Sequence, residues 1–273
     1  MGLFTNLIPF FIRTLSSINP NAATRLAVKV FVSPKKYPRA PDEDNFWQNG
    51  KPVTFASGCV GRTFGESEKV IWLVPGWEGR SSRFKLIIEA GVKAGFKMIA
   101  WDGPGHGDSP GDRANLVNVA KLLVQDAAAR ENEKVYAVIG HSFGANVAAF
   151  ACKIGFKSER LVLISAPGSI GNILVRFWQR VELPDSLKLL FTTEIEKETG
   201  VNISEVSIEN FIAKLPQKIQ IIHDKTDKEV PYAEAEALKA KNPAAVFVST
   251  EKLGHRRILD SQIVASLVLK FLV

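Results

Sequence analysis

The sequence GHSFG at residues 140–144 follows the apolar run VYAVI (135–139) and precedes the small-residue segment ANVAAFA (145–151). This order is typical of a buried strand, a G-x-S-x-G turn and a helix. A serine at the apex of such a turn adopts a strained backbone conformation that only small neighbours permit, and its hydroxyl then projects clear of the sheet. The context predicts that Ser142 is a nucleophile, whereas the alternative is an ordinary glycine-rich connection.

Two segments further along the chain hold the groups that a serine nucleophile needs. The apolar run KIQIIHD (218–224) leads into an acidic turn that contains Asp227, and the segment KLGH (252–255) places His255 after another expected strand. We expect His255 to act as the general base and Asp227 to orient its ring. Asp224 is a rival acid three residues earlier, and its alternative role is that of a turn former.

These segments and two glycine-rich loops resemble the α/β-hydrolase superfamily from about Val53 to the end of the chain. The loops are VPGWEG (74–79) and DGPGHGDS (102–109), and all the patterns occur in the order usual for the superfamily. The resemblance implies an α/β-hydrolase fold, with a mostly parallel, eight-stranded type of sheet flanked by helices and a small helical cap. The superfamily pattern G-x-x-D-x-x-V-P favours Asp227 over Asp224, because Asp227 stands three residues before Val230.

The resemblance also implies an oxyanion hole made by the backbone N–H groups of Trp77 and Phe143. Pro75 stands where related H-G-x-x-G loops carry a histidine that braces the loop, so this support is missing from the sequence. The side chain of Trp77 either lines the pocket or only packs.

The remaining histidines, His106, His141 and His223, are expected to be structural, with His141 packing under the serine turn. The sequence has no i, i+4 histidine pair and no C-x-x-C motif, so we expect no metal ion. The proposed chemistry needs only water, and no cofactor is expected.

The order of elements predicts an α/β protein in three parts. Apolar runs without alternation indicate strands buried on both faces of a parallel sheet, at 70–74, 97–101, 135–139 and 161–164. An opening hairpin is expected at 53–64, and helices at 83–94, 116–130, 146–153, 232–241 and 261–272. We expect an N-terminal helical arm at 1–45, an α/β-hydrolase core at 46–166 and 216–273, and the cap at 167–215.

Four apolar residues of the expected cap are candidates for the roof of a substrate pocket: Phe177, Trp178, Leu190 and Phe191. The alternative for each is that it only packs the cap on the body. So short a cap favours a small or medium acyl group.

The net charge of +7 is diffuse, and no nucleic-acid-binding motif is present, so a cationic surface without a nucleic-acid partner is expected. A sharper hypothesis is that Arg80, Arg83 and Arg256 attract an anionic substrate. The two cysteines, Cys59 and Cys152, are expected to be free thiols, which fits a reducing, cytoplasmic location.

The N-terminal apolar run LIPFFI (7–12) is too short to span a membrane, and residues 22–31 have the spacing of an amphipathic helix. We expect this arm to pack on the body. Contact with a membrane surface through the arm, or export, is the alternative. The sequence leaves the oligomeric state open.

A serine esterase or thioesterase that acts on a small-molecule ester is the leading interpretation. A peptidase, a carbon–carbon bond hydrolase and a perhydrolase use the same three residues and stay open as alternatives. A non-catalytic member of the superfamily that binds a ligand is the alternative from another class.

Overall fold

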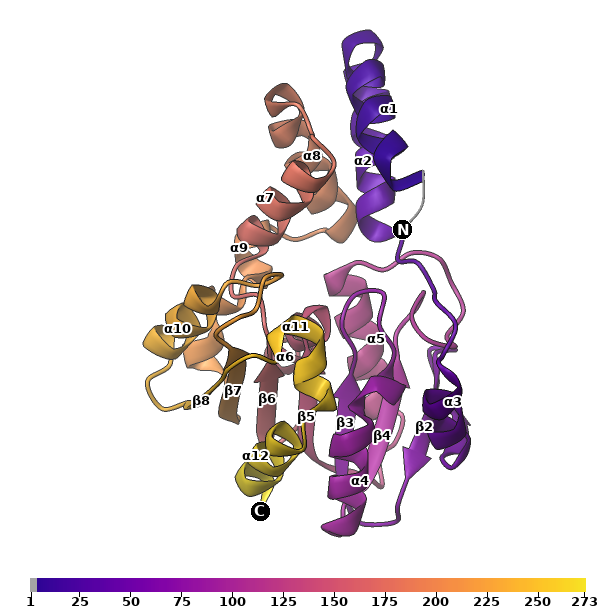
Figure 1. The fold of residues 1–273 in the computed structure, drawn as a ribbon, viewed down its shortest axis with the longest axis vertical. Helices are drawn as coiled ribbons and strands as arrows, with labels where there is room; N and C mark the ends of the chain where they lie inside the picture. Colours follow the sequence, from indigo (N-terminus) through magenta and orange to yellow (C-terminus); the bar gives the residue numbers. More distant parts are fainter. Residues whose placement is uncertain (1–3) are drawn as a thin grey trace.

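An eight-stranded sheet forms the centre of the computed structural model, which describes residues 4–273 (Figure 1). The strands are β1 (Lys51–Thr54), β2 (Val60–Phe64), β3 (Lys69–Val74), β4 (Lys97–Asp102), β5 (Lys134–His141), β6 (Arg160–Ile164), β7 (Lys218–Asp224) and β8 (Val246–Thr250). Their spatial order is β1-β2-β4-β3-β5-β6-β7-β8. The pairs β1–β2 and β2–β4 are antiparallel and all the others are parallel, so the predicted mostly parallel α/β sheet is confirmed.

The central strands are apolar throughout because each contributes to two hydrophobic cores. In β3, Trp72 and Val74 point into one core, whereas Ile71 and Leu73 point into the other. Successive side chains of a strand lie on opposite faces, so a sheet covered on both sides needs apolar residues at every position.

Helices cover both faces of the sheet. The helices α5 (Leu116–Ala128), α6 (Phe143–Lys153) and α10 (Tyr232–Lys241) pack on one face, and α3 (Pro41–Gln48), α4 (Lys85–Lys93) and α12 (Gln262–Leu272) pack on the other. The short helix α11 (Gly254–Arg257) follows β8. All five helices expected in the core are present, and α6 begins earlier than expected, directly after Ser142.

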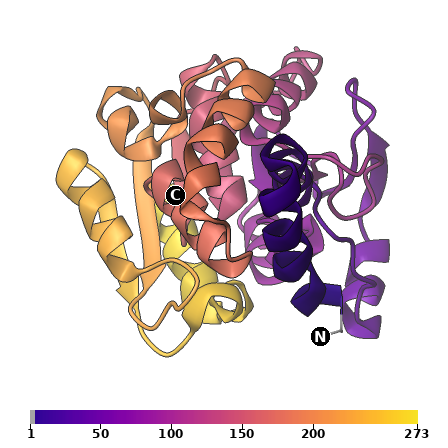
Figure 2. The same ribbon diagram turned by 90° about the horizontal axis from the view of Figure 1, so that it is seen from above.

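Two groups of helices lie beyond the carboxyl edge of the parallel strands (Figure 1). We call α1 (Phe4–Ile18) and α2 (Pro20–Val32) the N-terminal arm. The helical insertion between β6 and β7 consists of α7 (Ile170–Arg180), α8 (Asp185–Thr199), α9 (Ile203–Val206) and two short 3₁₀ turns at Ile208–Asn210 and Ile212–Lys214. Seen from above, the arm and the insertion lie side by side over the sheet (Figure 2).

An aromatic cluster joins the arm to the insertion. Phe31 of α2 lies 4.9 Å from Phe177 and 5.6 Å from Phe191, measured between ring centroids. Phe191 is fully buried, and Trp178 meets its ring edge-on at 6.3 Å. Phe177 and Phe191 therefore pack between the arm and the insertion, and Trp178 packs on Phe191 within the insertion. The role of these three residues and of Leu190 in a pocket stays a prediction.

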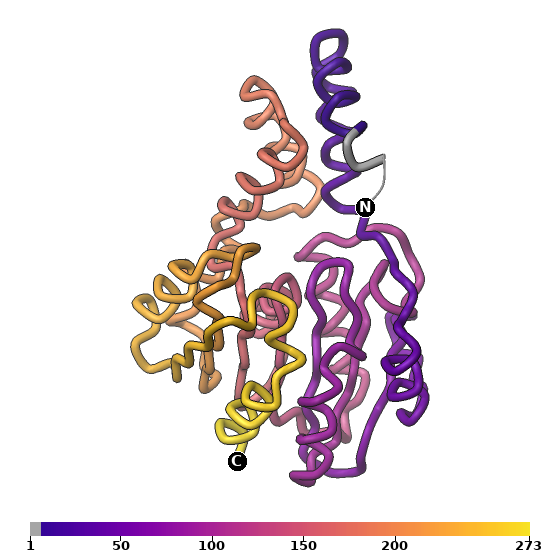
Figure 3. Tube along the Cα trace, in the orientation of Figure 1, coloured from indigo at the N-terminus to yellow at the C-terminus, as the bar shows by residue number. Residues whose placement is uncertain are grey.

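The sequence predicted one amphipathic helix at 22–31, and the structure has two in this part of the chain. The helix α2 starts at Pro20, with the side chain of Asn19 accepting a hydrogen bond from the N–H of Ala22. The apolar run 7–12 belongs to α1, which contains Pro9. The chain reverses direction at Asn19, so the two helices form a hairpin (Figure 3).

Among residues 4–273, no helix is both long enough and apolar enough to span a lipid bilayer. Both cysteines are free and buried.

The aromatic cluster leads to a prediction about stability. We expect Phe191→Ala to lower the free energy of unfolding by about 3 kcal/mol, because a fully buried aromatic side chain leaves a cavity. Urea denaturation measures this change. The matched control is Leu189→Ala in the same helix, whose side chain is 78% exposed and whose effect should stay within about 0.5 kcal/mol. Equal effects of the two substitutions would contradict this account of the packing.

Candidate active site

Ser142 sits at the junction of β5 and α6 in a strained backbone conformation. Its φ and ψ are 53° and −122°, values that cost energy for any residue with a side chain. The turn closes so tightly that a Cβ atom on Gly140 would lie 2.3 Å from the carbonyl oxygen of Gly144. A Cβ atom on Gly144 would lie 2.1 Å from the carbonyl oxygen of Val74. The two glycines of the motif are therefore required by close backbone packing, and Ser142 itself stays partly exposed.

His255 meets Ser142 from the other side of the site. It lies in α11, and its Nε2 atom is 2.8 Å from the Oγ atom of Ser142. Its Nδ1 atom is 2.7 Å from Oδ2 of Asp227. The three sequence-predicted side chains thus form one continuous chain of hydrogen bonds, although they come from three separate loops at the carboxyl edge of the sheet.

Asp227 is held in place by the loop that follows β7. Its Oδ1 atom accepts hydrogen bonds from the backbone N–H groups of Glu229 at 2.8 Å and Val230 at 2.9 Å, which leaves Oδ2 for His255. Burial acts to raise the pKa of Asp227, but the hydrogen bonds from His255 and the backbone outweigh it and the pKa is lowered. Asp227 is therefore an anion where it faces the imidazole.

The rival acid Asp224 has a different place. Its Oδ1 atom accepts from the N–H and the hydroxyl of Thr226, and its Oδ2 atom accepts from Thr250 and from the N–H of Leu253. Burial acts to raise its pKa, but these bonds hold the pKa well below its usual range. Asp224 thus ties the loop of Asp227 to the loop of His255, a role that the sequence did not reveal because its partners lie on another strand.

His141 supports His255 through the backbone. Its Nε2 atom donates to the carbonyl oxygen of His255 at 2.8 Å. Burial lowers its pKa to about 3, so the ring is neutral at physiological pH. The expected packing role under the serine turn was incomplete, because no local sequence signal links residue 141 to a carbonyl more than a hundred positions later.

The loop after β3 packs directly on the serine turn. A Cβ atom on Gly76 would lie 3.1 Å from the Cβ atom of Ser142, so a side chain there would require its neighbours to shift by a few tenths of an ångström. The N–H of Gly79 donates to the carbonyl of Gly76, which closes a turn with Trp77 and Glu78 at its centre. Glu78 has a positive φ of 56°. Trp77 directly follows Gly76 in this turn. The N–H of Phe143 lies at the start of α6, where helical N–H groups have no partner within the helix.

Other contacts brace this loop in place of the missing histidine. The carboxylate of Glu78 accepts a hydrogen bond from the N–H of Lys35 at 3.2 Å, and the N–H of Gly107 donates to the carbonyl of Gly79 at 3.3 Å. The side chains of Trp77, Phe143 and His106 pack on one another with centroid distances of 5.2–5.8 Å. Burial lowers the pKa of His106, in agreement with a structural histidine.

The loop DGPGHGDS is organised by its first and last residues. Oδ1 of Asp102 accepts hydrogen bonds from the N–H and the hydroxyl of Ser81, both at 2.7 Å. Ser109 accepts a hydrogen bond from the N–H of Val60 at 2.8 Å, which ties the loop to β2. These residues build the scaffold next to the loop after β3 and lie outside the hydrogen-bond chain of Ser142, His255 and Asp227.

Charged side chains at the rim are paired within the protein. Arg83 lies 2.9 Å from Asp260, and Arg256 lies 2.9 Å from Glu229. Arg80 is largely buried and donates to the carbonyl of Tyr37. These pairings reduce the attraction that the three arginines exert on an anionic substrate. Glu229, which the sequence did not single out, lies 4.0 Å from Nε2 of His255.

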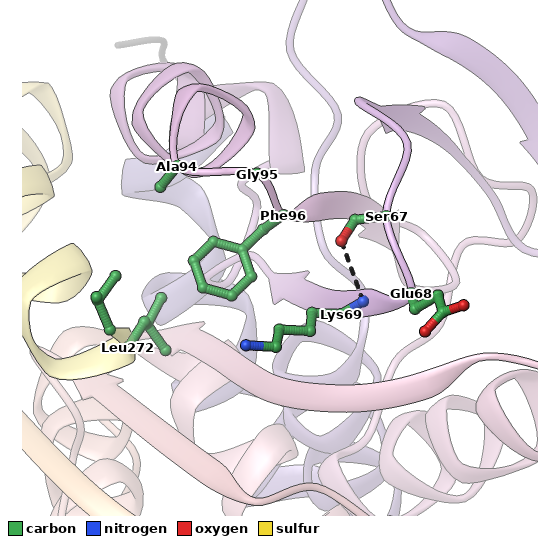
Figure 4. A pocket seen from close by; sticks show the side chains of 8 residues that line it. Ser67, Glu68, Lys69, Ala94, Gly95, Phe96 and Leu272 are labelled. Atoms are coloured by element: carbon green, nitrogen blue, oxygen red, sulfur yellow. Dashed lines mark hydrogen bonds between the residues drawn. The ribbon is translucent and has the colours of Figure 1, made fainter.

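Residues 4–273 contain no group of three or more His, Cys, Asp or Glu side chains arranged to hold a metal ion. A pocket lined by Lys69, Phe96 and Leu272 lies at the opposite, amino-terminal edge of the sheet (Figure 4). It is remote from Ser142 because β3 and β4 begin there and end at the carboxyl edge.

Comparison with known proteins agrees with this geometry. The family model described as serine aminopeptidase, S33, a group of α/β hydrolases, matches residues 65–204, which include the loop after β3 and the serine turn. The chain belongs to this family. The predicted membership of the α/β-hydrolase superfamily is therefore confirmed. A search of the curated proteins gave no match.

Solved structures of this superfamily share the fold at low sequence identity. An esterase of Pyrococcus furiosus is 21% identical, with a TM-score of 0.65 over 88% of this chain and 96% of its own. A meta-cleavage product hydrolase of Pseudomonas fluorescens is 19% identical, with a TM-score of 0.60 over 82% and 97%. A hydrolase of Pseudomonas aeruginosa is 16% identical, with a TM-score of 0.62 over 82% and 98%. These similarities support the α/β-hydrolase fold of the S33 family member described here.

The environment of His141 predicts a pH dependence of stability. Its folded pKa of about 3 lies below the ordinary 6.5, so only the unfolded chain binds a proton there between these values. The stability that it contributes is complete above pH 6.5 and is lost as the pH falls toward 3. In the variant His141→Gln, the free energy of unfolding should therefore fall less steeply as the pH is lowered, by up to about 1.4 kcal/mol per pH unit. Urea denaturation between neutral and mildly acidic pH measures the two slopes, and identical slopes would overturn the assignment.

Proposed function

We propose that this protein is a serine hydrolase that cleaves carboxylic esters or thioesters through an acyl-enzyme. The observation that carries the proposal is the unbroken hydrogen-bond chain from Ser142 through His255 to Asp227, with distances of 2.8 and 2.7 Å. A serine hydroxyl needs such a base to become a nucleophile at neutral pH.

In the acylation step, His255 Nε2 takes the proton of Ser142 while the oxygen attacks the substrate carbonyl carbon. The imidazolium that forms is stabilised by the carboxylate of Asp227, which also keeps Nδ1 protonated. The imidazolium then gives its proton to the leaving alcohol or thiol as the carbonyl–leaving-group bond breaks. Water repeats the sequence on the acyl-enzyme, releases the carboxylic acid and restores Ser142.

The developing oxyanion is the negative charge that the site has to stabilise. We assign this role to the backbone N–H groups of Phe143 and Trp77, the first at the start of α6 and the second in the turn closed by Gly76 and Gly79. The positive end of the α6 dipole adds to the stabilisation.

Phe177, Trp178, Leu190 and Phe191 are proposed to limit the acyl pocket through the helical insertion. The first three are partly exposed, whereas Phe191 is fully buried against Phe31. The side chains of Phe177 and Trp178 are therefore more accessible to a ligand than that of Phe191. The substrate class that fits is a small to medium acyl group.

A peptidase is the second candidate, because the matching family model carries the description serine aminopeptidase. The carboxylate of Glu229, 4.0 Å from His255 Nε2, is a group that could pair with a substrate amine. Aminoacyl p-nitroanilides distinguish this candidate from an esterase, which should prefer p-nitrophenyl esters.

The first test is hydrolysis of p-nitrophenyl esters from acetate to palmitate. We expect turnover to peak at short or medium chains and Ser142→Ala to lower kcat by at least about a thousandfold, because the nucleophile is lost. Labelling by a fluorophosphonate, followed by mass spectrometry, should modify Ser142. A folded protein that neither turns over any ester or anilide nor reacts with the probe would support a non-catalytic member and sink the proposal.

Asp227 and Asp224 provide a matched pair of substitutions. Asp227→Asn should lower kcat by about ten-thousandfold with little change in KM, because the amide favours the wrong tautomer of His255. Asp224→Asn should act mainly on stability, since it weakens four hydrogen bonds, of which the two from Thr250 and Leu253 join its loop to the segment before His255. Ester hydrolysis and urea denaturation on both variants measure this contrast. A larger loss of kcat in Asp224→Asn would reverse the assignment of the acid.

A further inference from the structure

The first helix of the arm is apolar on two sides. One side packs on the protein through Ile12, which is fully buried, with Ile8 and Leu15 partly buried beside it. The other side carries Leu7, Phe10, Phe11 and Ile18, whose exposed fractions are 41%, 53%, 56% and 77%. The intervals of three, four and seven residues between these positions place them on one face of α1. We call these four residues the outer face of α1.

The charged side chains of the arm itself are all basic. Arg13 in α1 and Arg25 and Lys29 in α2 are exposed. Six lysines and arginines precede the first acidic residue of the sequence, which is Asp42. A row of large apolar side chains flanked by cations is the chemistry that the headgroup region of an anionic bilayer accommodates.

We propose that the outer face of α1 docks the protein on an anionic lipid bilayer. Phe10, Phe11 and Ile18 enter the boundary between headgroups and acyl chains, while Arg13, Arg25 and Lys29 pair with lipid phosphates. The proposal concerns contact with the surface of a bilayer and involves no spanning segment.

A second copy of the chain is a less suitable partner for this face. A twofold dimer through α1 would bring the cations of both arms together without an acidic residue in either arm to neutralise them. An anionic lipid surface supplies the missing negative charge and also covers the apolar row.

The position of the arm gives this contact a consequence for the site. The arm and the helical insertion lie beyond the same edge of the sheet from which Ser142, Asp227 and His255 project (Figure 1). Docking through α1 therefore places the end of the molecule that holds the carboxyl edge, and not the end that holds Lys69 and Phe96, next to the bilayer. The binding itself does not depend on the proposed hydrolase activity, so the two can fail separately.

Co-sedimentation of the full chain with vesicles tests the proposal. We expect binding to vesicles of phosphatidylglycerol and phosphatidylcholine that weakens as salt is raised, and much weaker binding to phosphatidylcholine alone. The double variant Phe10→Ser/Phe11→Ser should bind at least about tenfold more weakly, because two partly exposed aromatic rings no longer transfer from water into the bilayer. The pair Arg13→Gln/Arg25→Gln should weaken binding to the anionic vesicles.

The matched control is Ile263→Ser in α12, an apolar side chain that is 68% exposed on a helix away from the arm. It should bind like the wild type, and thermal unfolding should show that all variants are folded. Absence of wild-type binding, or equal binding by the phenylalanine variant, would overturn the proposal. So would a wild-type dimer in light scattering that becomes a monomer in that variant, since the outer face would then be a self-association interface.

Discussion

The strained backbone of Ser142 is the constraint around which the rest of the site is arranged. A positive φ at a serine persists only where the surrounding chain leaves no alternative. Here β5 fixes the residue before it, α6 begins at the residue after it, and the N–H of Ser142 donates to the carbonyl of Ile164 in β6. Gly140 and Gly144 let backbones meet at distances that a side chain would forbid. The strain lifts the hydroxyl out of the sheet, where a base can reach it.

The partners of Ser142 are held by the same kind of backbone support. Two N–H groups orient Asp227, the ring of His141 holds the carbonyl of His255, and Asp224 joins their two loops. The contacts of His141 and Asp224 tie one segment at the carboxyl edge to another, whereas those of Asp227 lie within its own loop. A proton transfer between Ser142 and His255 would therefore depend on residues outside that pair, because a proton can be transferred only between atoms held at hydrogen-bond distance.

Packing between aromatic side chains joins the helices that lie outside the sheet. The arm and the insertion are far apart in sequence, yet Phe31 lies against Phe177 and Phe191. This contact gives the insertion a support that the sheet alone does not provide. It also uses aromatic residues that the sequence offered as pocket candidates. The hydrophobic periodicity of an amphipathic helix shows which side chains are apolar, but it does not show whether they pack on another helix or line a pocket.

The sequence by itself determined the parallel sheet, the five core helices and the chain order of Ser142, Asp227 and His255, because buried strands and the G-x-S-x-G turn have local signatures. It did not reveal α1, whose apolar run is short and contains Pro9, nor the bond from His141 to His255. The superfamily pattern favoured Asp227 over Asp224, and the tertiary structure shows that the carboxylate of Asp227 faces His255, because that contact depends on where each carboxylate points. It also decided what braces the loop after β3 without the usual histidine. Those contacts join residues that are distant in sequence, and local pattern carries no information about them.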